Sequence, residues 1–442
     1  MRIAKLLFFV FLFSCYFDAA SQQVSNSAIV EQTTAELFVS KNWQKLIKYG
    51  EQAIKDGYNY YYLQLRVGIA CYEQKKFMRA IGHFEKALQF NSSDPLALEY
   101  LYYSYLFSGR STQARALAAT FPYSLKEKIK YPKNKFIKGI YTEGGIASSN
   151  LDETYRAIDI DGPFNKYGET TITKNMRYFH IGVNHELSSI MSVYHGYNNI
   201  NIDQLRKIRI NNKDTFDSFK LTQHDYYINT VLQFKHFAFS PALHLINVSF
   251  AKLNSQYNEN TYKYFFSKKD TSFINYAASF SLSKNCGIYT YTLTPGYSQL
   301  NGLTQIQTGL SIAYFPLGVP DYYGTSSLIY LNENNTNRLI LSQKIGLKLI
   351  PKLWMEAGIT YGNLQNYSEN NAFVVFNTGD KIKYKYGVSL TSPLSKHLEL
   401  SIRYDCFNRI NTYYLINNVQ TLESRYVSYK TQAIIGGIKW NL

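Results

Sequence analysis

Residues from about 135 to the C-terminus alternate between apolar and polar side chains, and this period of two is the feature that most constrains the fold. The clearest run covers residues 381–390. One face carries Ile382, Tyr384, Tyr386, Val388 and Leu390, and the other carries Lys381, Lys383, Lys385, Gly387 and Ser389. Successive side chains of a β-strand point to opposite faces, so the pattern predicts strands with one apolar face. Many runs reach ten residues or more, whereas soluble strands average about 5–6 and a tilted membrane strand needs about 9–11.

The connections between these runs alternate between short and long. Short turns are expected near 188–189, 235–236, 284–285, 316–318, 351–352 and 395–396, and longer polar stretches near 150–174, 210–217, 254–269, 332–336, 368–379 and 413–426, with Asn301-Gly302 as the one short exception. Outer-membrane barrels alternate in this way and place aromatic girdles at both interfaces, for which the chain has 41 Tyr and 28 Phe. Residues 371–380 either extend neighbouring strands or lie in a loop.

Because backbone polar groups in lipid must all be paired, such strands must close into a ring. We therefore predict a 14-stranded antiparallel transmembrane β-barrel over residues 135–442. A large soluble β-domain is the alternative, since the alternation in any one segment is a weak signal.

Residues 26–125 have helical texture and an internal repeat. The pairs that show the repeat are Trp43 and Phe77, Leu46 and Ala80, Ile47 and Ile81, Ala53 and Ala87, and Ala80 and Ala114. Their common period of 34 is that of the tetratricopeptide repeat, a helix-turn-helix unit. The positions that resemble packing positions of that family are Gly68, Ala80, Phe84 and Ala87. The resemblance implies an N-terminal helical tetratricopeptide-repeat domain over 26–125 and a linker over 126–134, with a helical plug or spacer that binds nothing as the alternative.

The N-terminus has the three parts of a secretory signal. Residues 1–5 form a basic segment, residues 6–13 form an unbroken apolar run, and Ala19-Ala20-Ser21 supplies the small residues that a signal peptidase recognises. We predict a signal peptide over residues 1–21. The four residues that end at Cys15 loosely resemble a lipobox, so lipidation of Cys15 is the competing interpretation.

No catalytic or metal-binding motif emerges from the sequence. His185-Glu186 begins like the zinc-protease motif, but Ser189 occupies the position of the second histidine. Cys71, Cys286 and Cys406 are too scattered for a disulfide framework or a metal site, and we expect buried or lipid-facing apolar side chains there. We expect no enzyme, no cofactor and no bound metal, while an active site on the barrel rim stays open as a hypothesis.

The polar faces of the last five predicted strands would point into the barrel. They carry Lys344, Lys348, Glu356, Lys381, Lys383, Lys385, Glu399, Arg403, Asp405 and Lys439. One interpretation is a conduit or binding surface that prefers anionic solutes. The favoured one is a network of internal ion pairs that stiffens and seals the barrel, because acidic residues are interleaved with basic ones. The net charge of +16 suits an anionic outer leaflet, and no motif of a nucleic-acid module is present, so we expect no nucleic acid as a partner.

A secreted repeat domain followed by a C-terminal barrel resembles two groups in domain order and strand count. One is the surface lipoprotein assembly modulators, and the other is the YaiO-type outer-membrane barrel proteins. Residues 427–442 also resemble the C-terminal signal that the barrel assembly machinery recognises, although Leu442 replaces the usual aromatic residue. The resemblance implies a Gram-negative outer-membrane protein that contacts outer-membrane lipids, meets that machinery during biogenesis and holds its repeats in the periplasm.

The repeats stand just before the point where the chain enters the membrane. The leading hypothesis is that they bind a partner polypeptide, a protein or peptide client in the periplasm, and that the barrel acts in export, assembly or surface display. The residues expected to line the binding groove lie on the first helix of each repeat: Tyr61, Leu65, Tyr72, Tyr100 and Tyr103. The alternative is a passive or solute-selective outer-membrane channel with the repeats as a plug or spacer.

Overall fold

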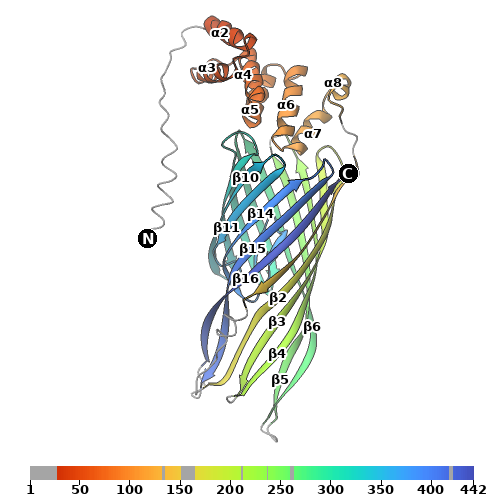
Figure 1. Cartoon of the computed structure of the whole chain (residues 1–442), viewed down its shortest axis with the longest axis vertical. Coiled ribbons are helices and arrows are strands. Elements are labelled where there is room, and N and C mark those ends of the chain that lie inside the picture. Colours follow the sequence, from red (N-terminus) through yellow and green to blue (C-terminus); the bar gives the residue numbers. More distant parts are fainter. Residues whose placement is uncertain are drawn as a thin grey trace.

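A helical domain is followed by a closed antiparallel barrel, as predicted (Figure 1). The computed structural model describes residues 27–131, 135–150, 165–210, 213–235, 237–258, 263–417 and 422–442. The predicted signal peptide over 1–21, with Cys15, lies outside the described residues, as do residues 132–134 of the predicted linker.

The helical domain consists of helical hairpins that follow the sequence repeat. Its helices are α2 (Ser27–Val39), α3 (Trp43–Lys55), α4 (Tyr61–Glu73), α5 (Phe77–Phe90), α6 (Pro95–Phe107), α7 (Ser111–Ala119) and α8 (Tyr123–Lys128). The first helices of the three hairpins begin at positions 27, 61 and 95, and the second helices begin at 43, 77 and 111. Both series advance by the spacing of the sequence repeat, so the period seen in the sequence is also the period of the helices.

Small residues let neighbouring helices of this domain approach closely. A Cβ atom on Gly50 would lie 2.3 Å from Cγ2 of Val67, and one on Gly68 would lie 2.7 Å from Cε1 of Phe84. Both distances are shorter than a van der Waals contact, so a larger residue would push the helices apart. Phe84 is fully buried in the gap that Gly68 leaves.

Local sequence signals mark the start of the third hairpin. At the start of α6 the Asp94 carboxylate caps the helix by accepting a 2.6 Å hydrogen bond from the amide of Ala97, and Pro95 occupies the first helical position. Helix α8 crosses residue 125, and the first barrel strand begins at Ile137. In the described part of the chain, no helix combines the length and the apolar character that crossing a membrane requires.

Fourteen strands form the barrel, each antiparallel to the next. They are β1 (Ile137–Ser149), β2 (Asn165–Glu186), β3 (Met191–Ile210), β4 (Lys213–Gln233), β5 (Ala238–Asn258), β6 (Lys263–Cys286), β7 (Tyr289–Leu300), β8 (Leu303–Tyr314), β9 (Tyr322–Glu333), β10 (Thr336–Ile350), β11 (Leu353–Tyr361), β14 (Lys381–Pro393), β15 (Leu398–Asn417) and β16 (Leu422–Asn441). The ring closes where β1 pairs with β16, from Gly139 opposite Asn441 to Ser149 opposite Thr431. The last strand thus pairs with the first, as closure in lipid requires.

Several stretches predicted as long loops are strands instead. The β3–β4 hairpin is paired up to Ile210 opposite Lys213, and the β5–β6 hairpin is paired up to Asn258 opposite Lys263. The expectation of loops over 210–217, 254–269, 332–336 and 413–426 was wrong for most of these residues. A hairpin that extends beyond the lipid can form paired strands from polar residues, because no apolar face is needed there and context outweighs intrinsic strand propensity. These hairpins project far from the helical domain (Figure 1).

The outer face of the barrel is apolar. Ile146, Ile274 and Leu339 are 67%, 71% and 63% exposed, and each belongs to the alternating apolar set of its strand. Many other large apolar side chains of the strands are exposed in the same way. Soluble proteins rarely expose so large an apolar surface, whereas lipid-facing barrel walls do.

We expect Phe84→Ala to lower the free energy of unfolding of the helical domain by about 3–5 kcal/mol, because it leaves a cavity under the stacked ring of Tyr100. Denaturant titration in detergent, followed by the helical circular-dichroism signal, measures this. Phe90 lies on the same helix and is 51% exposed, so Phe90→Ala is the matched control and is expected to cost less than about 0.5 kcal/mol. Equal losses in both variants would contradict the packing described here.

Candidate functional site

The segment between β11 and β14 folds into the barrel, and we call residues 362–380 the inner loop. It contains a short hairpin of β12 (Tyr367–Glu369) and β13 (Val374–Phe376). Asn370, Asn371 and Ala372 adopt positive φ angles of 50°, 57° and 61° at its tip, which makes the tight turn. Residues 371–380, left open between strand and loop by the sequence, therefore belong to a loop with a hairpin of its own.

One side of the inner loop is held by β4, β5 and β6. The Asn371 side-chain amide donates to the carbonyl of Ser240 at 2.7 Å, and its oxygen accepts from the Ser279 hydroxyl at 2.9 Å. Nδ1 of His244 lies 2.8 Å from the carbonyl oxygen of Ala372. A carbonyl only accepts, so Nδ1 carries the proton of His244. These contacts fix the tip of the loop against the wall.

The other side of the inner loop is held by strands across the barrel. The side-chain amide of Asn366 donates to Glu333 at 2.6 Å, and Lys385 pairs with Glu369 at 2.5 Å. Asp380 accepts from the Asn411 amide at 2.8 Å and from the hydroxyl of Tyr429. The loop is therefore tied to strands on several sides of the barrel and crosses its interior.

The base of the inner loop is also packed into an apolar cluster. The cluster comprises Ile329, Leu331, Ile340, Leu364, Tyr367, Phe376 and Ile382, all buried. Near the tip, the Phe373 ring lies 5.1 Å from the ring of Tyr227 and 5.4 Å from that of His180. Apolar packing thus anchors the base, whereas the tip depends on hydrogen bonds and one aromatic side chain.

A cavity of about 1200 Å³ lies in the lumen between the inner loop and the helical domain. Ser111 and Thr112 of α7 line it together with the strands and the inner loop. Its basic lining residues are Lys138, Lys344, Lys385, Arg403, Arg409 and Lys439, and its acidic ones are Glu143, Asp225, Glu356, Glu369, Glu399 and Asp405. Six of each sign leave the wall without a net formal charge, so the lumen carries no strong field of one sign.

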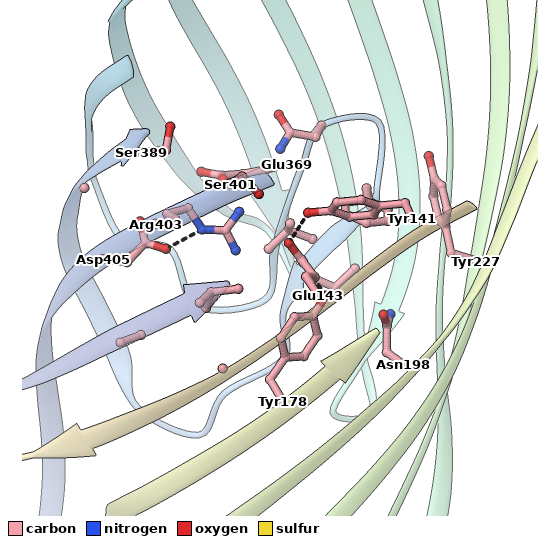
Figure 2. Close-up of a pocket in the computed structure, with 18 of the residues that line it drawn as sticks. Tyr141, Glu143, Tyr178, Asn198, Tyr227, Glu369, Ser389, Ser401, Arg403 and Asp405 are labelled. Carbon is pink, nitrogen blue, oxygen red and sulfur yellow. Dashed lines mark hydrogen bonds and ion pairs between the residues drawn. The ribbon is translucent and has the colours of Figure 1, made fainter. Parts of the chain in front are cut away.

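Arg403 is the central cation of this cavity (Figure 2). Its Nε lies 2.9 Å from the Asp405 carboxylate, and its other nitrogens point into the open space (Figure 2). Two strands away along the wall, on β1, the Glu143 carboxylate accepts hydrogen bonds from the hydroxyls of Tyr178, at 2.7 Å, and Tyr141. A guanidinium facing a carboxylate and phenols can bind polar groups of a solute, but it offers no nucleophile with an adjacent base.

Seven of the ten predicted lumen charges line this cavity: Lys344, Glu356, Lys385, Glu399, Arg403, Asp405 and Lys439. Several are in ion pairs, including Lys344 with Glu356 at 3.7 Å. Lys348 lies near the end of β10, 3.7 Å from Asp321 and 5.0 Å from the ring of Trp354.

Lys381 was placed on the wrong face by the sequence pattern. It stands opposite Ile410, whereas Ile382 stands opposite Arg409, a residue of the cavity. The register shifts between Ile382 and Tyr384, so a β-bulge at Lys383 breaks the alternation. Ile382 consequently points inward and is buried. The Lys381 ammonium instead lies 5.9 Å from the exposed ring of Tyr426, and Lys383 is exposed at the bulge.

The sequence analysis missed the polar wall on the first strands. Glu143, His180, Asn198, Asp225 and His244 are all buried in the lumen wall. His180 contacts the Asn198 side chain and the Tyr194 hydroxyl, both at 2.5 Å. The exposed residues Phe179 and Ile181 flank His180. The same alternation that marked the later strands was therefore present and would have identified these residues.

The helical domain rests on the end of the barrel that carries the short turns (Figure 1). The backbone amide of Met78 donates to the carbonyl of Gly318 at 3.0 Å, which joins α5 to the β8–β9 turn. Arg110 donates to the carbonyl of Gly287 at 3.1 Å, and the side-chain amide of Asn285 donates to Gln113 at 3.0 Å. The domain therefore covers the mouth of the barrel next to the cavity.

The most buried contact between the two parts is an ion pair of Arg115 on α7 with Glu186 at the end of β2. Both side chains are only 9% exposed, and Lys138 lies 3.8 Å from the same carboxylate. Burial lowers the pKa of Arg115 from its ordinary value. Within the described part of the chain, Nε and Nη2 of Arg115 are buried without a hydrogen-bond partner. Glu186 is thus used for docking, and its neighbour His185 stacks on His195 with ring centroids 5.1 Å apart.

The residues predicted to bind a partner polypeptide are packed within the helical domain. Leu65 belongs to its buried core, and Tyr61, Tyr72, Tyr100 and Tyr103 pack against that core while partly exposed. The rings of Tyr72 and Tyr100 meet edge to face at 4.9 Å. Partner binding by these residues stays a prediction.

Two ionisable groups of the helical domain are held neutral by burial. Burial raises the pKa of the Cys71 thiol to about 12 and lowers the pKa of His83 to about 4. Cys406 is buried as well, whereas Cys286 is exposed at the end of β6. Two of the three cysteines, Cys71 and Cys406, are therefore buried as expected.

No protein-family model matches the chain, and no curated protein matches it. Among solved structures, the chain is similar to the toluene transporter TodX of Pseudomonas putida, at 7% identity over 69% of this chain and 90% of that chain, with a TM-score of 0.44. A FadL homologue of Pseudomonas aeruginosa gives 8% identity over 79% and 94%, with a TM-score of 0.44. The monoaromatic hydrocarbon channel CymD gives 6% over 69% and 89%, with a TM-score of 0.38. Likenesses at this level carry no information on function.

Glu186→Gln is expected to loosen the helical domain from the barrel, because it leaves the buried Arg115 guanidinium without its counter-charge. Removing one partner of a buried pair costs about 3–5 kcal/mol. Hydrogen–deuterium exchange of the α7 amides, in detergent, should accelerate strongly. Arg177→Met removes a largely exposed pair with Asp203 and should leave α7 unchanged. Unaltered α7 exchange in Glu186→Gln would show that the docking does not depend on this pair.

Proposed function

We propose that this protein is a Gram-negative outer-membrane channel for small polar solutes, closed by the inner loop and capped by the helical domain. The observation that carries the proposal is the polar cavity of about 1200 Å³ in the lumen, enclosed between these two elements. Its volume is somewhat above the roughly 300–1,000 Å³ of small-molecule sites. The apolar outer wall supports a location of the barrel in lipid, and a solute in this cavity would then lie on a path across the membrane.

The helical domain is proposed to lie in the periplasm. It contacts the ends of β6–β7 and β8–β9, where the connections are short, whereas the longest hairpins project from the opposite end (Figure 1). Outer-membrane barrels have short turns on the periplasmic side and longer loops outside. The helix starts follow the period of the sequence repeat, which supports a tetratricopeptide-like stack. Aromatic side chains of the predicted groove, such as Tyr72 and Tyr100, pack against each other. This packing favours a domain that caps the barrel over one that holds an open groove for a partner polypeptide.

The solute is proposed to be polar without a strong preference for one sign of charge. The cavity has six basic and six acidic lining residues, and several are already paired. Pairing leaves little net field to select anions. This favours the internal ion pairs over an anion conduit as the role of the charged wall.

Movement of the inner-loop tip would open the path. The tip is held by hydrogen bonds of Asn371 and His244, and a typical hydrogen bond contributes only about 0.5–1.5 kcal/mol net. The apolar base of the loop would stay in place as the hinge. Such a tip can move without unfolding the barrel.

His244→Ala combined with Asn371→Ala should therefore raise solute flux severalfold. The measurement is the swelling rate of proteoliposomes in a neutral sugar. The control pair His397→Ala with Asn337→Ala removes the same residue types at exposed positions outside the lumen. A flux no different from that of protein-free liposomes, in the wild type and in the loop variant alike, would overturn the channel proposal.

Arg403→Gln and Lys381→Gln each remove one positive charge, but only Arg403 lines the cavity. We expect Arg403→Gln to shift the cation-to-anion permeability ratio towards cations by roughly twofold or more. Lys381→Gln should leave the ratio unchanged, because Lys381 faces outward at the bulge. Reversal potentials in planar bilayers under a salt gradient measure both. An equal shift in the two variants would mean that surface charge, rather than the lumen, sets the selectivity.

A further inference from the structure

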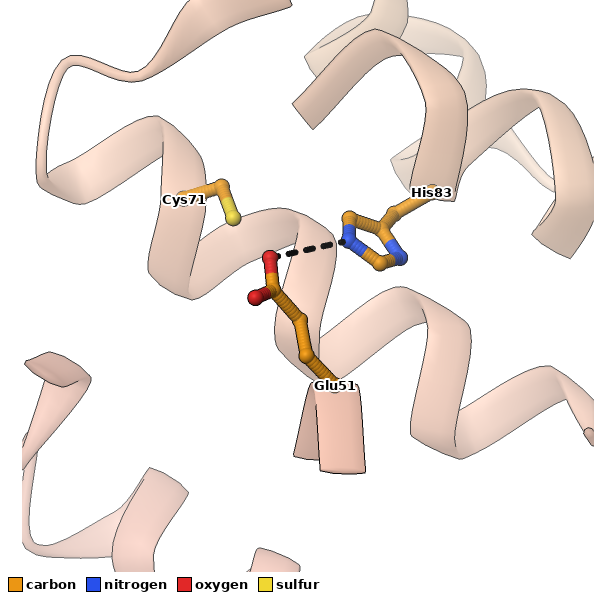
Figure 3. Close-up of side chains that lie close together, drawn as sticks. All are labelled: Glu51, Cys71 and His83. Carbon is orange, nitrogen blue, oxygen red and sulfur yellow. Dashed lines mark ion pairs between the residues drawn. The ribbon is translucent and has the colours of Figure 1, made fainter. Parts of the chain in front are cut away.

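Three side chains with metal-ligating atoms meet between α3, α4 and α5 (Figure 3). They are Glu51, Cys71 and His83, and a carboxylate oxygen, the thiol sulfur and a ring nitrogen all lie within 4.8 Å of one another. Their spacing along the chain matches no local metal motif, so the sequence did not predict the cluster. It lies in the helical domain, apart from the lumen.

The close helix contacts of this domain bring the three residues together. Gly50 packs against Val67, which places the adjacent Glu51 beside Cys71, one helical turn after Val67. Gly68 packs against Phe84, which brings the adjacent His83 to the same place. The cluster is thus built into the rigid part of the fold rather than on a loop.

A second group of residues orients the imidazole. Nδ1 of His83 lies 2.8 Å from Oε1 of Gln64, and the amide nitrogen of Gln64 donates to Asn59 at 2.8 Å. The Gln64 oxygen only accepts, so the proton of His83 belongs on Nδ1. Metal-ligating histidines are oriented in this way by a hydrogen bond from the second ring nitrogen.

The opposite ring nitrogen then faces the Glu51 carboxylate. Nε2 lies 4.0 Å from Oε1 of Glu51, which is too far for a direct hydrogen bond. With the proton on Nδ1, both atoms present lone pairs to each other. Two facing acceptors repel unless a cation lies between them.

The next pair of hairpins shows a different solution at the equivalent positions. One repeat further along the chain, Glu51, Cys71 and His83 correspond to Glu85, Tyr105 and Leu117. There the Tyr105 hydroxyl donates to Glu85 at 2.6 Å, and a leucine replaces the imidazole. A hydrogen bond satisfies the carboxylate at that interface, whereas the first interface gathers sulfur, nitrogen and oxygen ligands.

We propose that Glu51, Cys71 and His83 bind one divalent cation of the zinc class, with water as the fourth ligand. Thiolate, imidazole and carboxylate together suit zinc, whose bonds of about 2.0–2.3 Å place tetrahedral ligands roughly 3.4–3.7 Å apart. The side chains therefore need to close by about 1 Å around the ion. Cys71 is fully buried, while the Glu51 side chain is 34% exposed and leaves a path for the ion and the water. Binding releases the thiol proton to solvent.

Such an ion would link the first hairpin to the second. Glu51 belongs to α3, whereas Cys71 and His83 belong to α4 and α5. Helix α5 also carries the Met78 contact to the barrel. The cation would thus stiffen the part of the cap that rests on the β8–β9 turn.

The test uses full-length protein in detergent, freed of any histidine tag and of bound metal, with Co²⁺ as the spectroscopic probe and Zn²⁺ as competitor. We expect one equivalent of Co²⁺ to give a thiolate-to-cobalt charge-transfer band in the near ultraviolet, and Zn²⁺ to abolish it. Zn²⁺ should also raise the unfolding temperature of the helical signal. Cys71→Ser should lose the band, and Gln64→Met should weaken binding roughly 10–100-fold.

Glu51→Gln is the variant least able to disturb folding, because its side chain is partly exposed, and it should weaken binding at least tenfold. Glu85→Gln removes the equivalent carboxylate of the next interface and should bind Co²⁺ as the wild type does. Cys286→Ser removes the exposed thiol and should keep the band. Absence of the band in the wild type, its survival in Cys71→Ser, or equal weakening by Glu51→Gln and Glu85→Gln would each overturn the proposal.

Discussion

The structure depends on the requirement that every backbone polar group of a strand in lipid has a partner. The pairing of β1 with β16 meets this requirement at the seam and extends to Asn441. Beyond it, the Leu442 amide donates to the Lys138 carbonyl at 3.0 Å. The seam needs small residues. A Cβ on Gly139 would lie 2.7 Å from the Trp440 carbonyl oxygen, and one on Gly145 would lie 2.6 Å from that of Ile434. Closure then fixes which side chains face lipid and which face the lumen.

A closed ring of fourteen strands also leaves a lumen, and other parts of the chain have to fill it. Eight strands leave an interior that wall side chains fill, whereas fourteen leave an open lumen. The inner loop and the helical domain occupy this space and its mouth. The polar inner wall is what allows them to do so, because Ser279, His244 and Lys385 can hold a loop that an apolar wall would reject. The lumen charges and the loop are therefore consequences of one architecture.

The period of two carried the prediction of the fold, and its failures have physical causes. Alternation reports which face of a strand meets lipid, so it identified the strands and seven of the lumen charges. It carries no signal for the part of a hairpin that extends beyond the membrane, as at 254–269. It also assumes an unbroken register, and the bulge at Lys383 reversed the assignment of Lys381 and Ile382. The path of the inner loop is set by contacts with strands far away in sequence, such as Gln223 with Asn377 at 3.0 Å. A local pattern contains no trace of such contacts. The same holds for Glu51, Cys71 and His83, which only the helix packing brings together.

The two elements that close the lumen are attached in different ways, and this sets the order in which they can open. The inner loop has an apolar base among Ile340, Leu364 and Phe376, and burial of each such side chain contributes about 1.5–3 kcal/mol. The described contacts of the cap with the barrel are mostly polar, and its one deeply buried pair leaves two guanidinium nitrogens of Arg115 without partners. A buried pair that is incompletely satisfied contributes little net stability, since desolvation offsets the attraction. The cap is therefore the element that separates more easily, and the inner loop is the one whose tip moves while its base stays. In the proposed orientation, a solute arriving from outside would meet the tighter closure first and the weaker one last.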